Sequence, residues 1–93
     1  MRVWSNRSTS TSEYVEVLLV RAALMVHRQP VKGFSVSTNV FSRKSEYDGL
    51  VDAKKKTLSL TEAESFAKKL ADDFGLVEDG DLVHRQRLWA VVK

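Results

Sequence analysis

Residues 61–75, TEAESFAKKLADDFG, carry the clearest structural signal in this 93-residue chain. Thr61 and Glu64 match a capping box at the start of a helix, and Gly75 suits the left-handed position after its last turn. Apolar side chains recur at the helical spacing i, i+3, i+4, i+7, i+8 and i+11, which predicts one apolar stripe: Ala63, Phe66, Ala67, Leu70, Ala71 and Phe74. The segment therefore predicts an amphipathic helix that packs on a neighbouring sheet.

The apolar run before this segment, residues 13–28 (EYVEVLLVRAALMVHR), predicts a second helix. Ser10 and Glu13 match another capping box, no turn residue interrupts the run, and Pro30 cannot continue a helix. A helix that is apolar on nearly every side is typical of a central core element or of a contact with another molecule. The β-branched valines leave a strand over residues 14–20 as the alternative.

Short strands are expected on either side of the two helices. Residues 34–40 alternate apolar and polar side chains, as a strand with one wet face does. Tight turns such as Asp48-Gly49 favour antiparallel pairing. Further strands are predicted at residues 2–4, 50–53, 57–60, 76–77 and 82–92. We therefore predict a small α+β domain of order (β)-α-β-β-(β)-α-β, with two helices packed on one face of an antiparallel sheet of three to five strands.

Length and composition limit the classes of protein that this chain can represent. Residues 1–93 are enough for one domain, and the polar residues after the first strand predict that residues 1–12 are partly mobile. Cysteine is absent, which excludes disulfides, thiolate catalysis and cysteine-ligated zinc. The apolar runs are too short to span a bilayer, and residues 1–14 have no apolar signal region. We expect a cytoplasmic protein with no membrane partner.

The sequence offers little for catalysis. His27 and His84 are the only histidines, and neither has carboxylates at the spacing of a metal site. The glycines are scattered rather than gathered in a phosphate-binding loop. We therefore predict no catalytic residue, no metal ion and no cofactor. A small ribonuclease-type toxin that uses His84 with Arg85 and Arg87 is a weaker alternative.

Basic residues provide the candidate contacts with a macromolecule. The first 56 residues hold ten Lys or Arg and five Asp or Glu, whereas residues 57–93 hold five Lys or Arg and seven Asp or Glu. Such an uneven field can orient a domain on an anionic partner. Cations bind phosphates, tryptophan stacks on bases, and Arg and Trp are also enriched in protein interfaces. The candidate binding residues are Arg43, Lys44, Lys54, Lys55, Lys56, Arg85, Arg87 and Trp89.

The expected function is that of a small non-catalytic binding protein. It would be a regulator, inhibitor or adaptor, of the kind that bacterial or phage genomes encode, and its partner would be another protein or a second copy of itself. The apolar second helix would supply the homodimer contact through Val15, Leu18, Leu19 and Met25. Nucleic-acid binding through the basic residues and Trp89 is the alternative, and no small-molecule partner is indicated.

Overall fold

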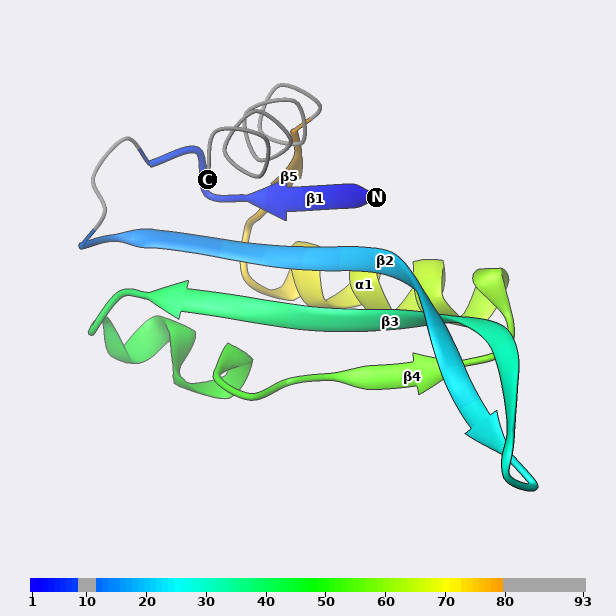
Figure 1. Cartoon of the computed structure of the whole chain (residues 1–93). Coiled ribbons are helices and arrows are strands. Elements are labelled where there is room, and N and C mark those ends of the chain that lie inside the picture. The colour runs from blue at the N-terminus through cyan, green and yellow to red at the C-terminus, as the bar shows by residue number, and fades with distance from the viewer. Residues whose placement is uncertain (9–11, 80–93) are drawn as a thin grey trace, which may run out of the picture.

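The computed structural model describes residues 1–8 and 12–79 and contains a five-stranded antiparallel sheet with an α-helix on one face (Figure 1). The strand order in the sheet is β4-β3-β2-β1-β5. The predicted α+β class and the antiparallel sheet are confirmed. Along the chain the elements are β1 (Arg2–Ser5), β2 (Tyr14–Val26), β3 (Gln29–Phe41), the 3-10 helix η1 (Ser45–Leu50), β4 (Lys55–Thr57), α1 (Leu60–Asp73) and β5 (Val77–Glu78).

The helix predicted over residues 13–28 is wrong, because residues 14–26 form the central strand β2. β2 pairs along its whole length with β3, from Tyr14 opposite Phe41 to Val26 opposite Gln29. Strands usually show their period of two by alternating apolar and polar residues. In β2 both faces are covered near its start, since even Glu16 is only 3% exposed. Apolar residues therefore occupy both faces and the alternation disappears from the sequence.

The segment between β3 and α1 also differs from the prediction. The strand expected over residues 50–53 is wrong: Leu50, which is fully buried, is the last residue of η1, and residues 51–53 form a turn and an irregular segment. The next strand covers Lys55–Thr57, rather than the expected residues 57–60, so Lys55 and Lys56 lie in a strand and not in a turn. The strand predicted over residues 34–40 is confirmed as part of β3.

The predicted helix is confirmed as α1, with a different cap. Ser59 is the N-cap, and its hydroxyl accepts a hydrogen bond from the backbone N–H of Glu62 at 3.3 Å. Ser59 and Glu62 repeat the capping-box spacing two residues before Thr61 and Glu64. Gly75 has φ +69°, as expected after a helix.

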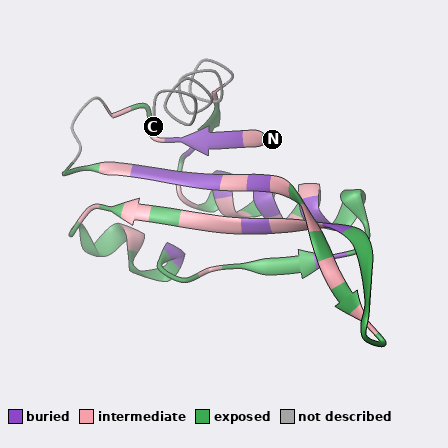
Figure 2. Cartoon of the chain, viewed as in Figure 1, coloured by how far each residue is buried: buried purple, intermediate pink, exposed green. Residues whose placement is uncertain are grey.

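The hydrophobic core lies between α1 and the sheet. Three alanines of α1 are buried, and alanine lets the helix approach the sheet closely because its side chain is small. Trp4, Val17 and Val36 supply the larger buried side chains from three neighbouring strands. Figure 2 shows that the buried residues gather where β1, β2 and β3 lie in front of the helix. The helix residues in this core are Ala63, Phe66, Ala67, Leu70, Ala71 and Phe74.

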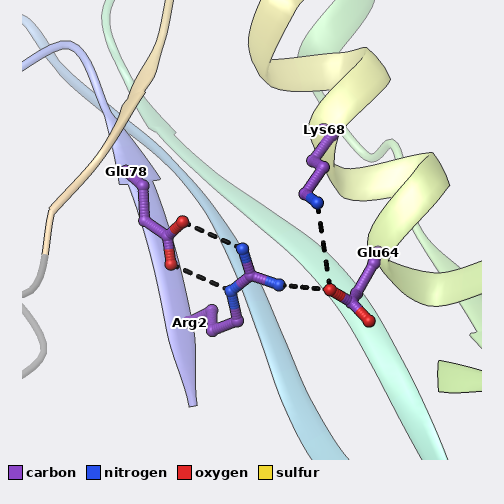
Figure 3. Close-up of polar contacts among 4 residues, drawn as sticks. All are labelled: Arg2, Glu64, Lys68 and Glu78. Atoms are coloured by element: carbon purple, nitrogen blue, oxygen red, sulfur yellow. Dashed lines mark hydrogen bonds and ion pairs between the residues drawn. The ribbon is translucent and has the colours of Figure 1, made fainter. Parts of the chain in front are cut away.

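Arg2 joins three elements at the edge of the sheet (Figure 3). Its guanidinium donates two hydrogen bonds of 2.9 Å to the carboxylate of Glu78 on β5 and one of 2.6 Å to Glu64 on α1. It also lies 4.9 Å from the ring centroid of Trp4. Lys68 forms a longer ion pair of 3.9 Å with Glu64. This network connects residues that are up to 76 positions apart in the sequence.

Two remaining predictions concern the ends of the chain. Residues 2–5 of the segment expected to be mobile form β1, and residues 9–11 lie outside the described part of the structure. The last predicted strand, at residues 82–92, also lies outside it. Within the described part, no helix is both long and apolar enough to cross a membrane.

Candidate functional site

The β2–β3 hairpin extends beyond the rest of the sheet. β1 pairs with β2 over residues 16–19, and β4 pairs with β3 over residues 34–36. Beyond these pairings, residues 21–33 form a two-stranded ribbon whose outer edges pair with no other described strand. We call this ribbon the arm. Figure 1 shows that it runs past the N-terminal turn of α1 and curves away from the rest of the sheet.

One face of the arm continues the face of β2 that is buried in the core. Alternate residues of a strand share a face, so Arg21, Ala23 and Met25 follow Val17 and Leu19 on one side of β2. Val17 and Leu19 are buried, whereas the three arm residues are exposed (Figure 2). Met25 is 69% exposed, the highest value among the large apolar side chains in the described residues. The arm therefore presents to solvent a face that no helix of the described residues covers.

The turn at the tip of the arm consists of His27 and Arg28. Both have positive φ, +49° and +65°, as in the two-residue type I′ turn whose twist matches that of a hairpin. Asn and Gly are the usual residues there, and neither is present. Arg28 is exposed at this tip. The hairpin thus places a cation at its outermost point in a conformation that costs backbone energy.

The arm is cationic and contains no acidic residue. Between Glu16 and Glu46 the sequence has five Lys or Arg and one His, and no Asp or Glu. Three of these cations, Arg21, Arg28 and Lys32, lie exposed in the arm. No carboxylate of residues 1–8 and 12–79 forms an ion pair with them. The charge of the arm is therefore not neutralised by the part of the chain that the structure describes.

Arg21 and Lys32 flank a hollow at the base of the arm. Arg21 pairs with Phe34 and Ala23 pairs with Lys32, so the two cations are diagonal neighbours on one face, about 7–8 Å apart between their Cα atoms. The hollow has a volume of about 430 Å³ and is lined by Arg21, Ala22, Ala23, Lys32, Gly33 and Phe34. Two cations beside a shallow hollow are suited to an anionic group.

Gly33 is required at this position by close packing. A Cβ atom on Gly33 would lie 2.7 Å from Cδ1 of Leu24 and 2.9 Å from the carbonyl oxygen of Thr57. Any larger residue would therefore push Leu24 or β4 away. The absence of a side chain at Gly33 lets Leu24 lie across the ribbon on the face opposite Arg21.

The basic residues predicted from the sequence lie in two separate places. Lys55 and Lys56 pair with Val36 and Ser35, near the base of the arm, and the ammonium of Lys55 lies 5.6 Å from the ring centroid of Phe66. Arg43 and Lys44 follow the other end of β3, about 17 Å further along the strand. There they line a second hollow of about 660 Å³, and Lys44 pairs with Glu13 at 3.7 Å. The structure does not bring the two groups together; Lys54 is exposed beside Lys55.

The other predicted site residues are placed as follows. Arg85, Arg87 and Trp89 lie outside the described residues. Of the four residues expected at a homodimer contact, Val15 and Leu19 are buried in the core, Leu18 is half-buried on the opposite face and Met25 is exposed in the arm. Only Met25 is fully accessible to another molecule in this structure.

A polar cluster around the buried Glu16 lies on the face of the sheet opposite α1. The carboxylate of Glu16 accepts a hydrogen bond of 2.6 Å from the amide of Asn39 and another from the hydroxyl of Tyr14. Burial and the adjacent Glu16 carboxylate raise the pKa of Tyr14 well above its usual value, so the phenol stays protonated and acts as a donor. The ring of Tyr14 also stacks on Phe41, with centroids 6.3 Å apart. The cluster fixes the start of the hairpin.

Comparison with protein-family models, with curated proteins and with solved structures gave no match. In the described residues, no three His, Asp or Glu side chains gather where they could hold a metal ion. The arm cations Arg21, Arg28 and Lys32 were missed by the sequence analysis because the run around them predicts a helix. The signal that indicates them is the long interval without an acidic residue.

Proposed function

We propose that this chain is a non-catalytic protein that binds nucleic acid through the arm. The observation that supports the proposal is the projection of Arg21, Arg28 and Lys32 from an acid-free ribbon. Nucleic acids carry a regular array of phosphates, and binding of Lys or Arg releases condensed counterions, which drives association. A protein that binds nucleic acid in this way could regulate it simply by occupying its binding site, and that role needs no catalytic residue.

The charge pattern favours nucleic acid over an acidic protein as the partner. Protein interfaces are usually built around an apolar centre with charged residues at the rim. The arm shares this arrangement in part, since Met25 and Pro30 lie between the cations at its base, Arg21 and Lys32, and its tip, but no carboxylate accompanies these cations in residues 21–33. These cations lie at the two ends of about 17 Å of strand, the five residues of rise from Arg21 to Val26, and this spread suits a line of phosphates.

The proposal is tested by measuring fluorescence anisotropy of labelled 24-mer DNA and RNA with the purified protein. We expect binding of the wild-type protein to weaken steeply between 50 and 200 mM salt. The triple variant Arg21→Ala/Arg28→Ala/Lys32→Ala should bind about tenfold to a hundredfold more weakly at low salt. Its plot of log affinity against log salt should be shallower by about 3 units, one for each lost phosphate contact.

A matched control removes three cations elsewhere, in Arg7→Ala/Lys68→Ala/Lys69→Ala. This variant has the same net charge as the arm variant, but it leaves the arm intact. It should retain most of the affinity and most of the salt dependence. Equal losses in the two variants would show that net charge alone governs binding, and salt-independent affinity of the wild-type protein would contradict the proposal.

Protein binding through the arm is a second candidate, favoured by the outer edges of its strands, which pair with no other strand in the described part of the chain. An exposed edge can accept a strand from another chain, and Met25 and Val31 add exposed apolar area. The partner would be another protein or a second copy of this chain. Sedimentation equilibrium between about 5 and 500 µM tests the homodimer: a mass that rises with concentration, and falls back in Met25→Lys, supports it. A constant monomer mass would exclude self-association in this range.

A further inference from the structure

We propose that the arm binds a duplex in the minor groove and inserts the Met25–Pro30 pair as an apolar wedge at one base step, which bends the duplex. This inference rests on the proposed nucleic-acid binding and names the form of the nucleic acid and the way it is held. Apolar wedges of this kind, Met and Pro included, enter from the minor groove and partly unstack a base step.

The arm is built for a duplex rather than for a single strand. Proteins that hold single strands stack the bases on aromatic rings. Residues 21–33 contain no Phe, Tyr or Trp, and His27 in the turn is the only ring that could stack. Two-stranded ribbons are among the elements that bind duplex grooves, the minor groove included when inserted side chains deform it. The arm is limited to two strands because β1 and β4 end at its base.

The wedge consists of two apolar side chains on the same face as the cations. Met25 and Pro30 are directly opposite each other in the ladder, and both are exposed. Alternation along the strands places Arg21 and Lys32 on that face. An exposed Met beside a rigid Pro is costly in water, and burial between base pairs would remove that apolar surface from solvent.

The spacing along the strands fits a groove. Lys32 lies two residues, about 7 Å, from Pro30, and Arg21 lies four residues, about 13 Å, from Met25. The minor groove of B-form DNA is about 6 Å wide and 7.5 Å deep. With Met25 and Pro30 at its floor, the extended side chain of Lys32 reaches phosphates at its rim. Ala23 lies between Arg21 and Met25 and is small enough to leave this face open.

Pro30 is compatible with the ladder because of its position in the hairpin. In a two-residue hairpin the flanking pair, here Val26 and Gln29, exchanges hydrogen bonds, and the N–H groups of the next pair point outward. Pro30 belongs to that next pair. Its nitrogen therefore faces the open edge of β3, where the missing N–H breaks no ladder hydrogen bond. Alternation along β3 keeps the ring of Pro30 on the face that also carries Arg21 and Lys32.

The test uses the full-length protein with a 24-base-pair duplex that carries a donor and an acceptor dye at its ends. We expect wild-type protein to increase energy transfer, because a wedge bends a duplex by about 20–90°. We also expect at least tenfold tighter binding to the duplex than to the same single strand. A minor-groove ligand such as netropsin should compete for the site.

Met25→Ala is the informative variant, since this side chain is exposed and its truncation leaves the fold intact. It should bind the duplex more weakly than wild type, because the apolar contact of the wedge is lost, and it should give no increase in energy transfer even at protein concentrations that saturate the duplex. Val31→Ala is the matched control: Val31 is an exposed apolar residue of the arm that lies on the other face. It should bend the duplex as wild type does.

The outcomes separate this inference from the proposed function. Salt-dependent binding that needs the arm cations but gives no bend, or a bend that survives in Met25→Ala, overturns the wedge and leaves nucleic-acid binding standing. Equal affinity for the single strand overturns the duplex assignment. If the wild-type protein binds neither nucleic acid, both proposals fail, and protein contact through the arm becomes the explanation of its exposed face.

Discussion

Arg2 is the residue whose loss should most directly weaken the edge of the sheet. It forms a two-point contact with Glu78, a third contact with Glu64 and a cation–π contact with Trp4. Its side chain is 31% exposed, so solvent screens these contacts partly. We expect Arg2→Met to lower the free energy of unfolding by about 1 kcal/mol, at the upper end of exposed ion pairs. Urea denaturation followed by circular dichroism measures this.

The control for Arg2→Met is Lys68→Met, which removes only the 3.9 Å pair with Glu64. Pairs of this kind on a helix surface contribute about 0.3–0.5 kcal/mol. An equal loss of unfolding free energy in the two variants would show that all the contacts of Arg2 together stabilise the fold no more than one exposed ion pair does.

The pH dependence of stability provides a second test at the residue scale. Hydrogen bonds from Arg2 hold the pKa of Glu78 below its ordinary value, which is about 4.3 in unfolded chains. Because the pKa of Glu78 is lower in the folded state than in the unfolded state, its ionised carboxylate stabilises the fold at pH values above the unfolded-state pKa. This stabilisation is lost as the pH falls through the folded-state pKa. Wild type should therefore exceed Glu78→Gln in stability by a constant amount from about pH 7 to 5. That difference should shrink below about pH 4; a difference that does not change with pH would contradict the ion pair.

At the scale of the element, substitutions in the turn at the tip of the hairpin should change protein stability and nucleic-acid binding in opposite directions. His27 and Arg28 both adopt positive φ, which costs a residue with a Cβ roughly 1 kcal/mol. The double variant His27→Asn/Arg28→Gly supplies the preferred type I′ residues. We expect it to raise the free energy of unfolding by about 1 kcal/mol while it weakens nucleic-acid binding, because one arm cation is lost. A parallel fall in stability and binding would mean that the turn is not of this type.

The elements also show how far the sequence determines the fold and where it does not. α1 was predicted closely because its stripe of Ala63, Phe66 and Leu70 meets only one surface, so its helical period is preserved. β2 was not, because both of its faces are covered near Glu16 and its length exceeds that of an ordinary strand. The turn at His27 contains none of the residues that usually mark a hairpin. Pro30 indicates a helix end in the sequence, whereas in the structure it lies opposite Met25 in the hairpin, with its nitrogen directed away from the ladder.

The candidate site was predictable only in its chemistry. The excess of cations in the first part of the chain is visible in the sequence, and it correctly indicates a basic region. The grouping of Arg21 with Lys32, however, depends on the pairing register of β2 with β3. A helix over the same residues would have separated them, so the site could not be assembled before the hairpin was known.

At the scale of the whole molecule, the arm and the core are separable. No residue of the arm belongs to the hydrophobic cluster of the described residues. Replacement of residues 23–32 by Asn-Gly would close the hairpin between Ala22 and Gly33, which already pair. We expect this shortened protein to keep its helical circular dichroism and a cooperative unfolding transition, and to bind nucleic acid on the order of tenfold more weakly or worse. Loss of cooperative unfolding would show that the arm is part of the core.

The open edges of the arm also have a consequence for the behaviour of many copies in solution. A long two-stranded ribbon whose outer edges pair with no other strand of residues 1–8 and 12–79 is a template for stacking into extended β-assemblies. Mutual repulsion among Arg21, Lys32 and their counterparts on neighbouring molecules opposes that stacking, and Pro30 interrupts one edge. The charges that suit a polyanion thus also act as gatekeepers against fibril formation. A variant that neutralises them gives up both properties together and should turn cloudy on concentration, where the wild-type protein stays clear.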